Sequence, residues 1–268
     1  MTSDIPASTH PLAIHVRGLR TQFGSHVVHD DLELAVRRGE VLGIVGGSGT
    51  GKSVLLRTII GLNRPAAGEI EVLGHLTGTG GAAAAKAIRR RWGVLFQDGA
   101  LFSSLTVAEN VEAPLREHSN LSPRLRREVA ELKVALVGLP PDANDKYPAE
   151  LSGGMRKRAG IARALALDPD ILFLDEPTAG LDPIGASNFD LLIADLQKSL
   201  GLTVVMITHD LDSLYAICDR VAVLIDKKTR IDTIPELMKI NHPWIQEYFG
   251  GPRGRAAIAS AERAGAAV

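Results

Sequence analysis

Short apolar runs alternate along the chain with longer stretches of helical periodicity. Five runs read as strands buried on both faces: residues 41–45, 94–96, 171–174, 203–207 and 221–225. Three segments nearer the N-terminus alternate apolar and polar positions, which is typical of antiparallel strands with one face in water: residues 13–16, 31–36 and 69–73. This succession of strands and helices predicts an α/β fold whose sheet is covered on both faces.

The middle of the chain follows a different pattern. From residue 99 to about residue 167 it is helical without a strong strand, so we expect a helical subdomain inserted into an α/β domain that spans residues 12–250. Residues 78–85 (GTGGAAAA) are small and of low complexity, and we expect a connector there. Residues 251–268 are rich in Gly, Ala and Arg without an amphipathic stripe, which predicts a flexible C-terminal tail.

A glycine-rich loop follows the apolar run at 41–45. It reads Gly46-Gly47-Ser48-Gly49-Thr50-Gly51-Lys52-Ser53 and fits the phosphate-loop pattern G-x-x-x-x-G-K-[ST]. The glycines let backbone N–H groups surround a phosphate chain, and the start of the next helix adds its positive dipole end. We expect Lys52 to reach the β- and γ-phosphates of a nucleotide and the Ser53 hydroxyl to bind Mg²⁺.

Two adjacent carboxylates end the apolar run at 171–174. A buried parallel strand delivers its last side chains to the ligand-binding edge of the sheet, where Asp175 and Glu176 follow. Adjacent carboxylates can divide the work: Asp175 would hold the Mg²⁺ shell and Glu176 would activate the attacking water. A surface turn would explain an isolated Asp-Glu pair equally well, and it is the phosphate loop upstream that favours the catalytic interpretation.

Composition limits the classes of partner and of site that we expect. The 268 residues carry 30 Lys and Arg against 31 Asp and Glu, a net charge of −1, so we expect no nucleic-acid partner. The single cysteine, Cys218, excludes an intramolecular disulfide and a cysteine-rich zinc site and favours a reducing compartment. The sequence shows neither a signal-peptide pattern nor an apolar run near the ~20 residues of a membrane helix, so we expect any membrane-spanning part to come from a partner.

Leu151-Ser152-Gly153-Gly154-Met155 resembles the LSGGQ signature of ATP-binding-cassette (ABC) ATPases. The other motifs of that family occur in the same order: Phe23 in the adenine-stacking loop, Gln97 in the Q-loop, Asp182 in the D-loop and His209 as the switch histidine. The resemblance covers about residues 12–250. Met155 replaces the usual glutamine and Phe23 the commoner tyrosine, and we expect activity to survive both changes.

The resemblance implies a P-loop NTPase fold with a RecA-like mixed-sheet core, an antiparallel β subdomain and an inserted helical subdomain. It implies ATP hydrolysis with Mg²⁺, in which the catalytic residues are Glu176, His209 and Gln97. Metal contacts would come from Ser53, Gln97 and Asp175. Expected ATP-binding residues are Phe23, Gly46, Gly47, Ser48, Gly49, Thr50, Gly51, Lys52, Ser53, Asp175, Ser152, Gly153, Gly154, Met155 and Asp182.

A second phosphate-binding helix start is predicted near Gly153, where Ser152 can cap the helix. In ABC ATPases the phosphate loop of one subunit and the signature of another sandwich each ATP. The resemblance therefore implies a homodimer that forms when ATP is bound.

Not every ABC ATPase drives transport. Chromosome and repair ATPases carry a very long coiled coil between phosphate loop and signature, and translation-type members carry two cassettes. This chain has one cassette and no sustained heptads, so we expect the ATPase subunit of a transporter, held on the cytoplasmic face of the inner membrane by separate permease subunits.

Within transporters, residues 96–118, 151–158 and 242–245 resemble the ATPase of Mla/Mce-type lipid transporters. Phospholipid or another hydrophobic molecule is then the expected cargo, with a small STAS-type regulatory subunit and a periplasmic lipid-binding protein in the complex. The alternative is an importer ATPase for a polar solute such as an amino acid.

Overall fold

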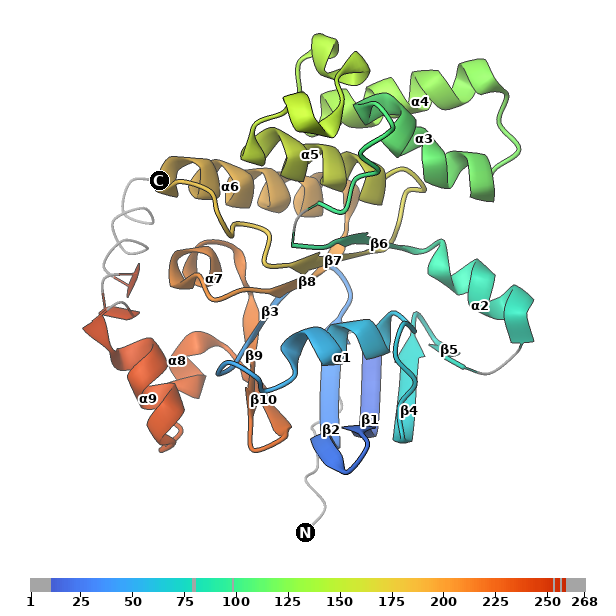
Figure 1. Ribbon diagram of the computed structural model, residues 1–268. Helices are drawn as coiled ribbons and strands as arrows, with labels where there is room; N and C mark the ends of the chain where they lie inside the picture. The colour runs from blue at the N-terminus through green and yellow to red at the C-terminus, as the bar shows by residue number, and fades with distance from the viewer. Residues whose placement is uncertain (1–10, 79–80, 98, 253, 256, 259–268) are drawn as a thin grey trace.

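The computed structural model describes residues 11–78, 81–97, 99–252, 254–255 and 257–258. Its centre is a six-stranded sheet in the order β10-β9-β3-β8-β7-β6 (Figure 1). All neighbours in this sheet run parallel except β10, which pairs antiparallel with β9 at the edge. The strands are β3 (Val41–Val45), β6 (Trp92–Leu95), β7 (Ile171–Asp175), β8 (Thr203–Ile207), β9 (Arg220–Ile225) and β10 (Lys228–Asp232).

A second, antiparallel sheet has the order β2-β1-β4-β5. Its strands are β1 (Leu12–Phe23), β2 (His26–Arg37), β4 (Ala67–Val72) and β5 (His75–Leu76). The pairing of β1 with β2 contains several register shifts and runs much further than the two predicted alternating segments. The alternation of apolar and polar residues is lost at such irregularities, so it marked only parts of each strand.

Helices cover both faces of the six-stranded sheet. Helix α1 (Lys52–Ile59) lies between the two sheets and packs Leu55, Leu56 and Ile59 into a core that both sheets share (Figure 1). The helices α3 (Val107–His118), α4 (Pro123–Leu136), α5 (Gly153–Ala164) and α6 (Pro183–Leu200) lie on the other face. Two 3₁₀ turns, η1 (Pro141–Asp145) and η2 (Pro148–Glu150), connect α4 to α5.

The buried strands divide their side chains between these two cores. In β7, Ile171 and Phe173 join the core around α1, whereas Leu172 and Leu174 join the core under the helices. A strand buried on both faces has no polar side, which is why these strands read as continuous apolar runs. The expected α/β fold, with its antiparallel sheet and inserted helices, is confirmed.

The remaining helices are α2 (Gly81–Arg89), α7 (Leu211–Ile217), α8 (Ile234–Leu237) and α9 (Pro243–Gly250). A third core joins α7, α8 and α9 to the end of β3, and Val45 belongs to the same buried cluster as Ile245 and Phe249. This core places a C-terminal helix beside the phosphate loop that follows β3.

Two sequence-based predictions differ from the structure. The segment expected to be a connector is helical from residue 81 onward, because Ala has the highest helix propensity of all residues; residues 79–80 lie outside the described part. The beginning of the expected flexible tail is also helical, and Ala257 is buried in the third core. Residues 259–268 lie outside the described part, so flexibility there stays a prediction.

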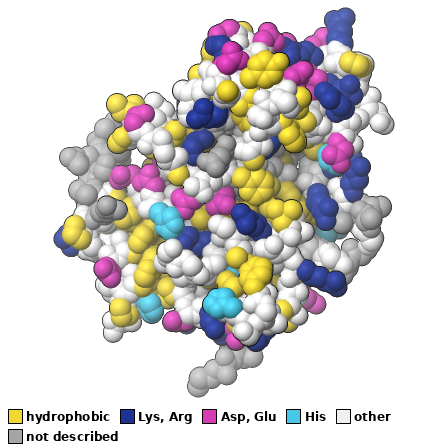
Figure 2. All heavy atoms as spheres, in the orientation of Figure 1, with side chains coloured by type: hydrophobic (Ala, Val, Ile, Leu, Met, Phe, Trp, Pro, Cys, Tyr) yellow, Lys and Arg dark blue, Asp and Glu magenta, His cyan; other side chains and the backbone are white. Residues whose placement is uncertain are grey.

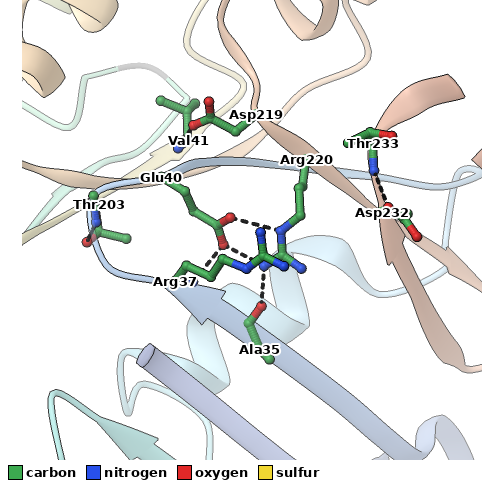
Figure 3. A network of polar contacts seen from close by, with 10 residues as sticks. Ala35, Arg37, Glu40, Val41, Thr203, Asp219, Arg220, Asp232 and Thr233 are labelled. Atoms are coloured by element: carbon green, nitrogen blue, oxygen red, sulfur yellow. Dashed lines mark hydrogen bonds and ion pairs between the residues drawn. The ribbon is translucent and has the colours of Figure 1, made fainter. Parts of the chain in front are cut away.

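A polar network ties the sheets together at the end away from the phosphate loop (Figure 3). The Arg220 guanidinium donates two hydrogen bonds to the Glu40 carboxylate, at 2.8 and 2.9 Å, and a third to the carbonyl oxygen of Ala35 at 2.9 Å. The Glu40 carboxylate also accepts from the amide of Arg37 at 2.6 Å. A bidentate pair in which every oxygen is used tolerates burial, so it can fix β2 against the starts of β3 and β9.

The surface agrees with the balanced composition. Figure 2 shows basic and acidic side chains interspersed over the visible face. Within the described residues, no helix is both long and apolar enough to span a bilayer.

Candidate functional site

The glycine-rich loop turns from β3 into α1 with its lysine folded back over it. The Lys52 ammonium is only 8% exposed and donates to the carbonyl oxygens of Gly46 at 2.8 Å and Gly47 at 3.1 Å. Gly51 has a φ of +99°, and a Cβ there would lie 2.4 Å from a Val28 methyl group. Only glycine fits this left-handed, crowded position, which brings the loop backbone close to β2.

The electrostatics of Lys52 suit an anion. Burial lowers the pKa of Lys52, and the negative charges of Glu176 and Asp175 oppose this by raising it. The ammonium donates to carbonyl dipoles, so a phosphate group at the loop would give it a full counter-charge. The loop and its lysine therefore fit the triphosphate of a nucleotide.

Asp175 and Ser53 bring oxygen ligands together across the cleft. Asp175 is the last residue of β7 and Ser53 the second residue of α1, and the Ser53 hydroxyl donates to the Asp175 carboxylate at 3.5 Å. Burial raises the pKa of Asp175, while the Arg57 charge, the Ser53 hydrogen bond and the Lys52 charge lower it. A hydroxyl beside a buried carboxylate is a donor set that fits Mg²⁺, which takes its other ligands from water and phosphate.

Glu176 and His209 form a pair beside these ligands. The Glu176 Oε1 lies 3.2 Å from the His209 Nε2. Burial raises the pKa of Glu176, and the charge and hydrogen bond of His209 counteract it. Glu176 also has a φ of +52°, a left-handed conformation that costs a non-glycine residue about 1–3 kcal/mol. This backbone conformation, just beyond the end of β7, directs the carboxylate toward His209.

One cleft of about 700 Å³ joins these groups. Val28 of β2 and Phe23, the last residue of β1, also line it, and Phe23 is 57% exposed. Ten of the predicted site residues line this cleft: Phe23, Ser48, Gly49, Gly51, Lys52, Ser53, Gln97, Asp175, Glu176 and His209. The cleft therefore combines an aromatic face, a phosphate cradle, oxygen ligands and a carboxylate–imidazole pair.

Three further loop residues shape the cleft without lining it. The Thr50 hydroxyl donates to the Gly47 carbonyl at 2.9 Å and closes the turn. A Cβ on Gly46 would lie 2.7 Å from the carbonyl oxygen of Leu224. Glycine is required at position 46 because the loop passes directly over β9 there.

The other predicted residues lie elsewhere. Ser152 is the N-cap of α5 and accepts a hydrogen bond from the Met155 amide at 3.2 Å, with Gly153 and Gly154 in the first turn. Asp182 caps α6 in the same way, accepting from the Gly185 amide at 2.9 Å. None of these five residues lines the 700 Å³ cleft. Within one chain, the start of α5 is therefore separate from the phosphate loop.

Sequence reasoning missed three neighbours of the cleft. His29 is fully buried under Gly51 and shares a 2.7 Å hydrogen bond with Thr21; burial lowers its pKa to about 4, so it is neutral. The Trp244 indole nitrogen lies 3.5 Å from where a Cβ of Gly47 would be. The Tyr248 hydroxyl donates to the His209 carbonyl oxygen at 3.4 Å. No spacing rule connects these positions to the loop, because only the folded sheet brings them there.

Sequence comparison identifies the family. The profile of the ABC transporter family matches residues 29–179. The probable ribonucleotide transport ATP-binding protein mkl of Mycobacterium tuberculosis is 40% identical over 243 residues, which is 90% of this chain and 67% of that protein. The methionine import ATP-binding protein MetN of Caulobacter vibrioides is 46% identical over 201 residues, covering 75% of this chain and 60% of that protein.

Solved structures show the same architecture. The ATP-binding cassette MJ0796, in a dimeric post-hydrolysis state with ADP and Pi, superposes with a TM-score of 0.74 at 31% identity; the match covers 82% of this chain and 98% of that one. The protein cbiO1 of Clostridium perfringens, part of the ABC transporter complex cbiONQ, superposes with a TM-score of 0.77 at 28% identity. The match covers 93% of this chain and 98% of that one.

Proposed function

The chain belongs to the ABC transporter family as an ATP-hydrolysing, ATP-binding subunit, and we propose that it dimerises on ATP and powers the movement of phospholipid or another hydrophobic molecule through separate permease subunits. The observation that carries the ATPase part is the convergence of Lys52, Asp175 and Glu176 on one cleft. These residues come from the ends of β3 and β7, where an α/β sheet binds its ligands.

The proposed reaction is attack of water on the γ-phosphate. Lys52 and the loop amides hold the phosphates, and Phe23 stacks on the adenine. Glu176 accepts a proton from the water while His209, 3.2 Å away, keeps that carboxylate and the γ-phosphate in line. Mg²⁺, held by Ser53 and Asp175 with Gln97 beside them, would neutralise charge on the phosphate oxygens.

The separation of the half-sites supports a dimer. Ser152 and the first turn of α5 present free amides and a helix dipole, but they do not face the cleft of their own chain. Two chains arranged head to tail would bring each signature to the ATP of the other. The cassette MJ0796 is described as dimeric, which supports the same arrangement here.

The cargo is proposed from motif resemblance. The segments around Gln97, the signature and α9 resemble Mla/Mce-type lipid transporters, whose complexes would include a small STAS-type subunit and a periplasmic lipid-binding protein. The names of the relatives favour a second candidate, import of a polar solute, since they specify ribonucleotide and methionine transport. The ATPase would be held at the cytoplasmic face of the inner membrane by its permease in either case.

Isolation of the complete transporter separates the two candidates. The chain is affinity-tagged in its host, the detergent-solubilised complex is purified, and its ATPase rate is measured with added phospholipid vesicles, methionine or ribonucleotides. Stimulation by phospholipid, with co-purified phospholipid in the extract, is the expected result. Stimulation by methionine or a ribonucleotide alone would replace the lipid proposal with the importer.

A further inference from the structure

A buried lysine on α5 contacts the backbone of two proposed catalytic residues. Lys157 is 7% exposed. Its ammonium donates to the carbonyl oxygen of Glu176 at 3.2 Å and to that of Gln97 at 3.4 Å. These carbonyls follow the ends of β7 and β6, neighbouring parallel strands in which Leu174 pairs with Leu95. One side chain therefore bridges two strand ends at the edge of the cleft.

Close packing holds this lysine in place. A Cβ on Gly160 would lie 2.6 Å from the Leu95 side chain and 3.3 Å from the backbone of Gly99, so α5 lies directly on β6 and the loop after it. A Cβ on Gly93 would lie 2.2 Å from the carbonyl oxygen of Ala164. Contacts this close leave α5 little freedom to slide against β6, so the position of the Lys157 ammonium is fixed by the fold.

The backbone of Glu176 needs such support. Its φ of +52° is unfavourable for a residue with a side chain. The Glu176 amide donates to the Ile207 carbonyl oxygen at 2.9 Å, and Lys157 donates to the carbonyl oxygen on the other side of the same Cα. Both peptide groups that flank Glu176 are thereby held, which fixes the direction of its carboxylate toward His209.

We propose that Lys157 is a positioning residue for ATP hydrolysis, which holds Glu176 and Gln97 in their working orientation through their carbonyl groups. The inference rests on the proposed roles of Glu176 and Gln97. Lys157 does not line the 700 Å³ cleft, so its loss should change the rate of the chemical step far more than the binding of ATP.

The chain offers a matched control on the same helix. Arg158 is also a cation on α5 that donates to a carbonyl oxygen, that of Val137, at 2.7 Å. Its partner follows α4, in the helical part of the molecule, and not the strand ends of the cleft. Substitution of Arg158 removes a comparable hydrogen bond from the same helix without touching Glu176 or Gln97.

The test measures steady-state ATPase rates and ATP binding of the full-length chain with Mg²⁺. Lys157→Met should lower kcat by about 10- to 100-fold while the Kd for ATP changes by less than about threefold. Lys157→Arg, which keeps the donors, should recover most of kcat, and Arg158→Met should keep kcat close to the wild-type value. Should Lys157→Met not fold, Lys157→Gln takes its place, since its amide is one bond shorter and cannot reach both carbonyls.

A kcat of Lys157→Met within about threefold of wild type would overturn the proposal. So would an equal loss in Arg158→Met, or a Lys157→Arg variant that folds but is as slow as Lys157→Met. Glu176→Gln is measured in parallel. If Glu176→Gln also hydrolyses ATP normally, the proposed function fails; if it is inactive while Lys157→Met is normal, only the role of Lys157 fails.

Discussion

At the scale of single residues, the cleft is defined by polar groups that the fold has partly removed from water. Burial pushes the pKa of Lys52 down and those of Asp175 and Glu176 up, and the opposite charges of these groups counteract each shift. Each ionised form therefore depends on its neighbours. Binding of a phosphate and a cation would complete this charge set, which is how the side chains fit ATP with Mg²⁺.

Glu176→Gln is expected to separate binding from turnover. The amide keeps the size of the side chain but cannot accept the proton of the water, so kcat should fall by about 10²-fold or more. The phosphate loop is untouched, so the Kd for ATP should stay within a few-fold of wild type. Radiolabelled ATP hydrolysis and equilibrium ATP binding measure the two quantities.

Glu128→Gln is the control, because Glu128 lies on α4, far along the chain from the cleft motifs, and pairs with Arg124 on an exposed face. It should hydrolyse ATP at the wild-type rate. Hydrolysis by Glu176→Gln within a few-fold of wild type would remove Glu176 as the water-activating residue.

At the scale of elements, helices that follow the cleft loops are joined below the surface. Asp182 caps the start of α6 and Asp210 caps the start of α7, and a buried hydrogen bond of 2.8 Å runs from the Ser213 hydroxyl of α7 to the Asp190 carboxylate of α6. Burial raises the pKa of Asp190 to about 6; the Ser213 hydrogen bond lowers it, and the charges of Asp210 and Asp212 raise it further. At neutral pH the ionised Asp190 carboxylate is therefore destabilised by its burial and by the nearby negative charges.

Asp190→Asn should therefore change how stability depends on pH. A pKa raised from 3.8 to about 6 means that the folded chain binds more protons than the unfolded chain between those values. The free energy of unfolding then falls as pH rises through this range, by at most about 3 kcal/mol from this group. The Asn variant lacks this loss, so it should be more stable than wild type at pH 7.5 and lose that advantage toward pH 4.

Urea unfolding at a series of pH values measures this difference. Asp195→Asn, an exposed position on the same helix, should track wild type throughout. An Asp190→Asn variant that parallels wild type at every pH would show that Asp190 is ionised normally in the folded chain.

The loop between Gln97 and α3 presents the large apolar side chain of Phe102 to solvent. On sequence alone, Leu101, Phe102 and Leu105 could be core of the helical subdomain or an apolar surface that receives a permease helix and couples it to ATP hydrolysis. In the structure Phe102 is 55% exposed, while Leu101 packs against the helical core. The buried Asn110 side chain anchors both the amide and the carbonyl of Phe102, at 2.7 and 3.1 Å. The ring can therefore be removed without loss of these backbone hydrogen bonds.

Phe102→Ala is expected to weaken the contact with the permease. The melting temperature and basal ATPase rate of the chain should stay close to wild type, while co-purification with the permease and the permease-stimulated rate should fall at least several-fold. Leu132→Ala, another exposed apolar residue but on α4, is the control and should keep both. A substantial drop in melting temperature for Phe102→Ala, or normal co-purification, would contradict the coupling role.

At the scale of the whole molecule, the two phosphate-type sites are held apart by the fold. Lys52 follows the central strand β3, whereas Ser152 begins a helix of the inserted subdomain. Neither site contains all the motif residues. We expect a complete site to require a second copy of the chain, so nucleotide binding and assembly should be linked.

Light scattering of the Glu176→Gln chain tests this linkage. Without nucleotide its mass should be near 28.5 kDa, and saturating Mg-ATP should roughly double it, with one ATP bound per chain. ADP should not produce the dimer, because it lacks the γ-phosphate that the signature would contact. A mass insensitive to ATP, with one ATP for every two chains, would exclude a symmetric sandwich.

The local part of this architecture was predictable from the sequence. Residues 46–53 are contiguous, and their meaning depends only on a preceding strand and a following helix, both of which the periodicity indicates. The buried strands were predictable because both of their faces are apolar, which makes each strand a continuous apolar run in the sequence. The edge strand β10 was missed, since its exposed side chains leave little hydrophobic signal.

The sequence by itself thus determined the fold class, the phosphate loop, the carboxylate pair and the family motifs, because each is encoded by neighbouring residues. Only the tertiary structure decided which motifs share a cleft. Ser53 and Asp175 are 122 positions apart and meet because β3 and β7 flank the same strand, β8, so that their carboxyl ends lie at one edge of the sheet. It also placed Lys157 behind Glu176 and His29 beneath Gly51. Strand order and burial arise from packing between distant segments, and no local pattern of residues records them.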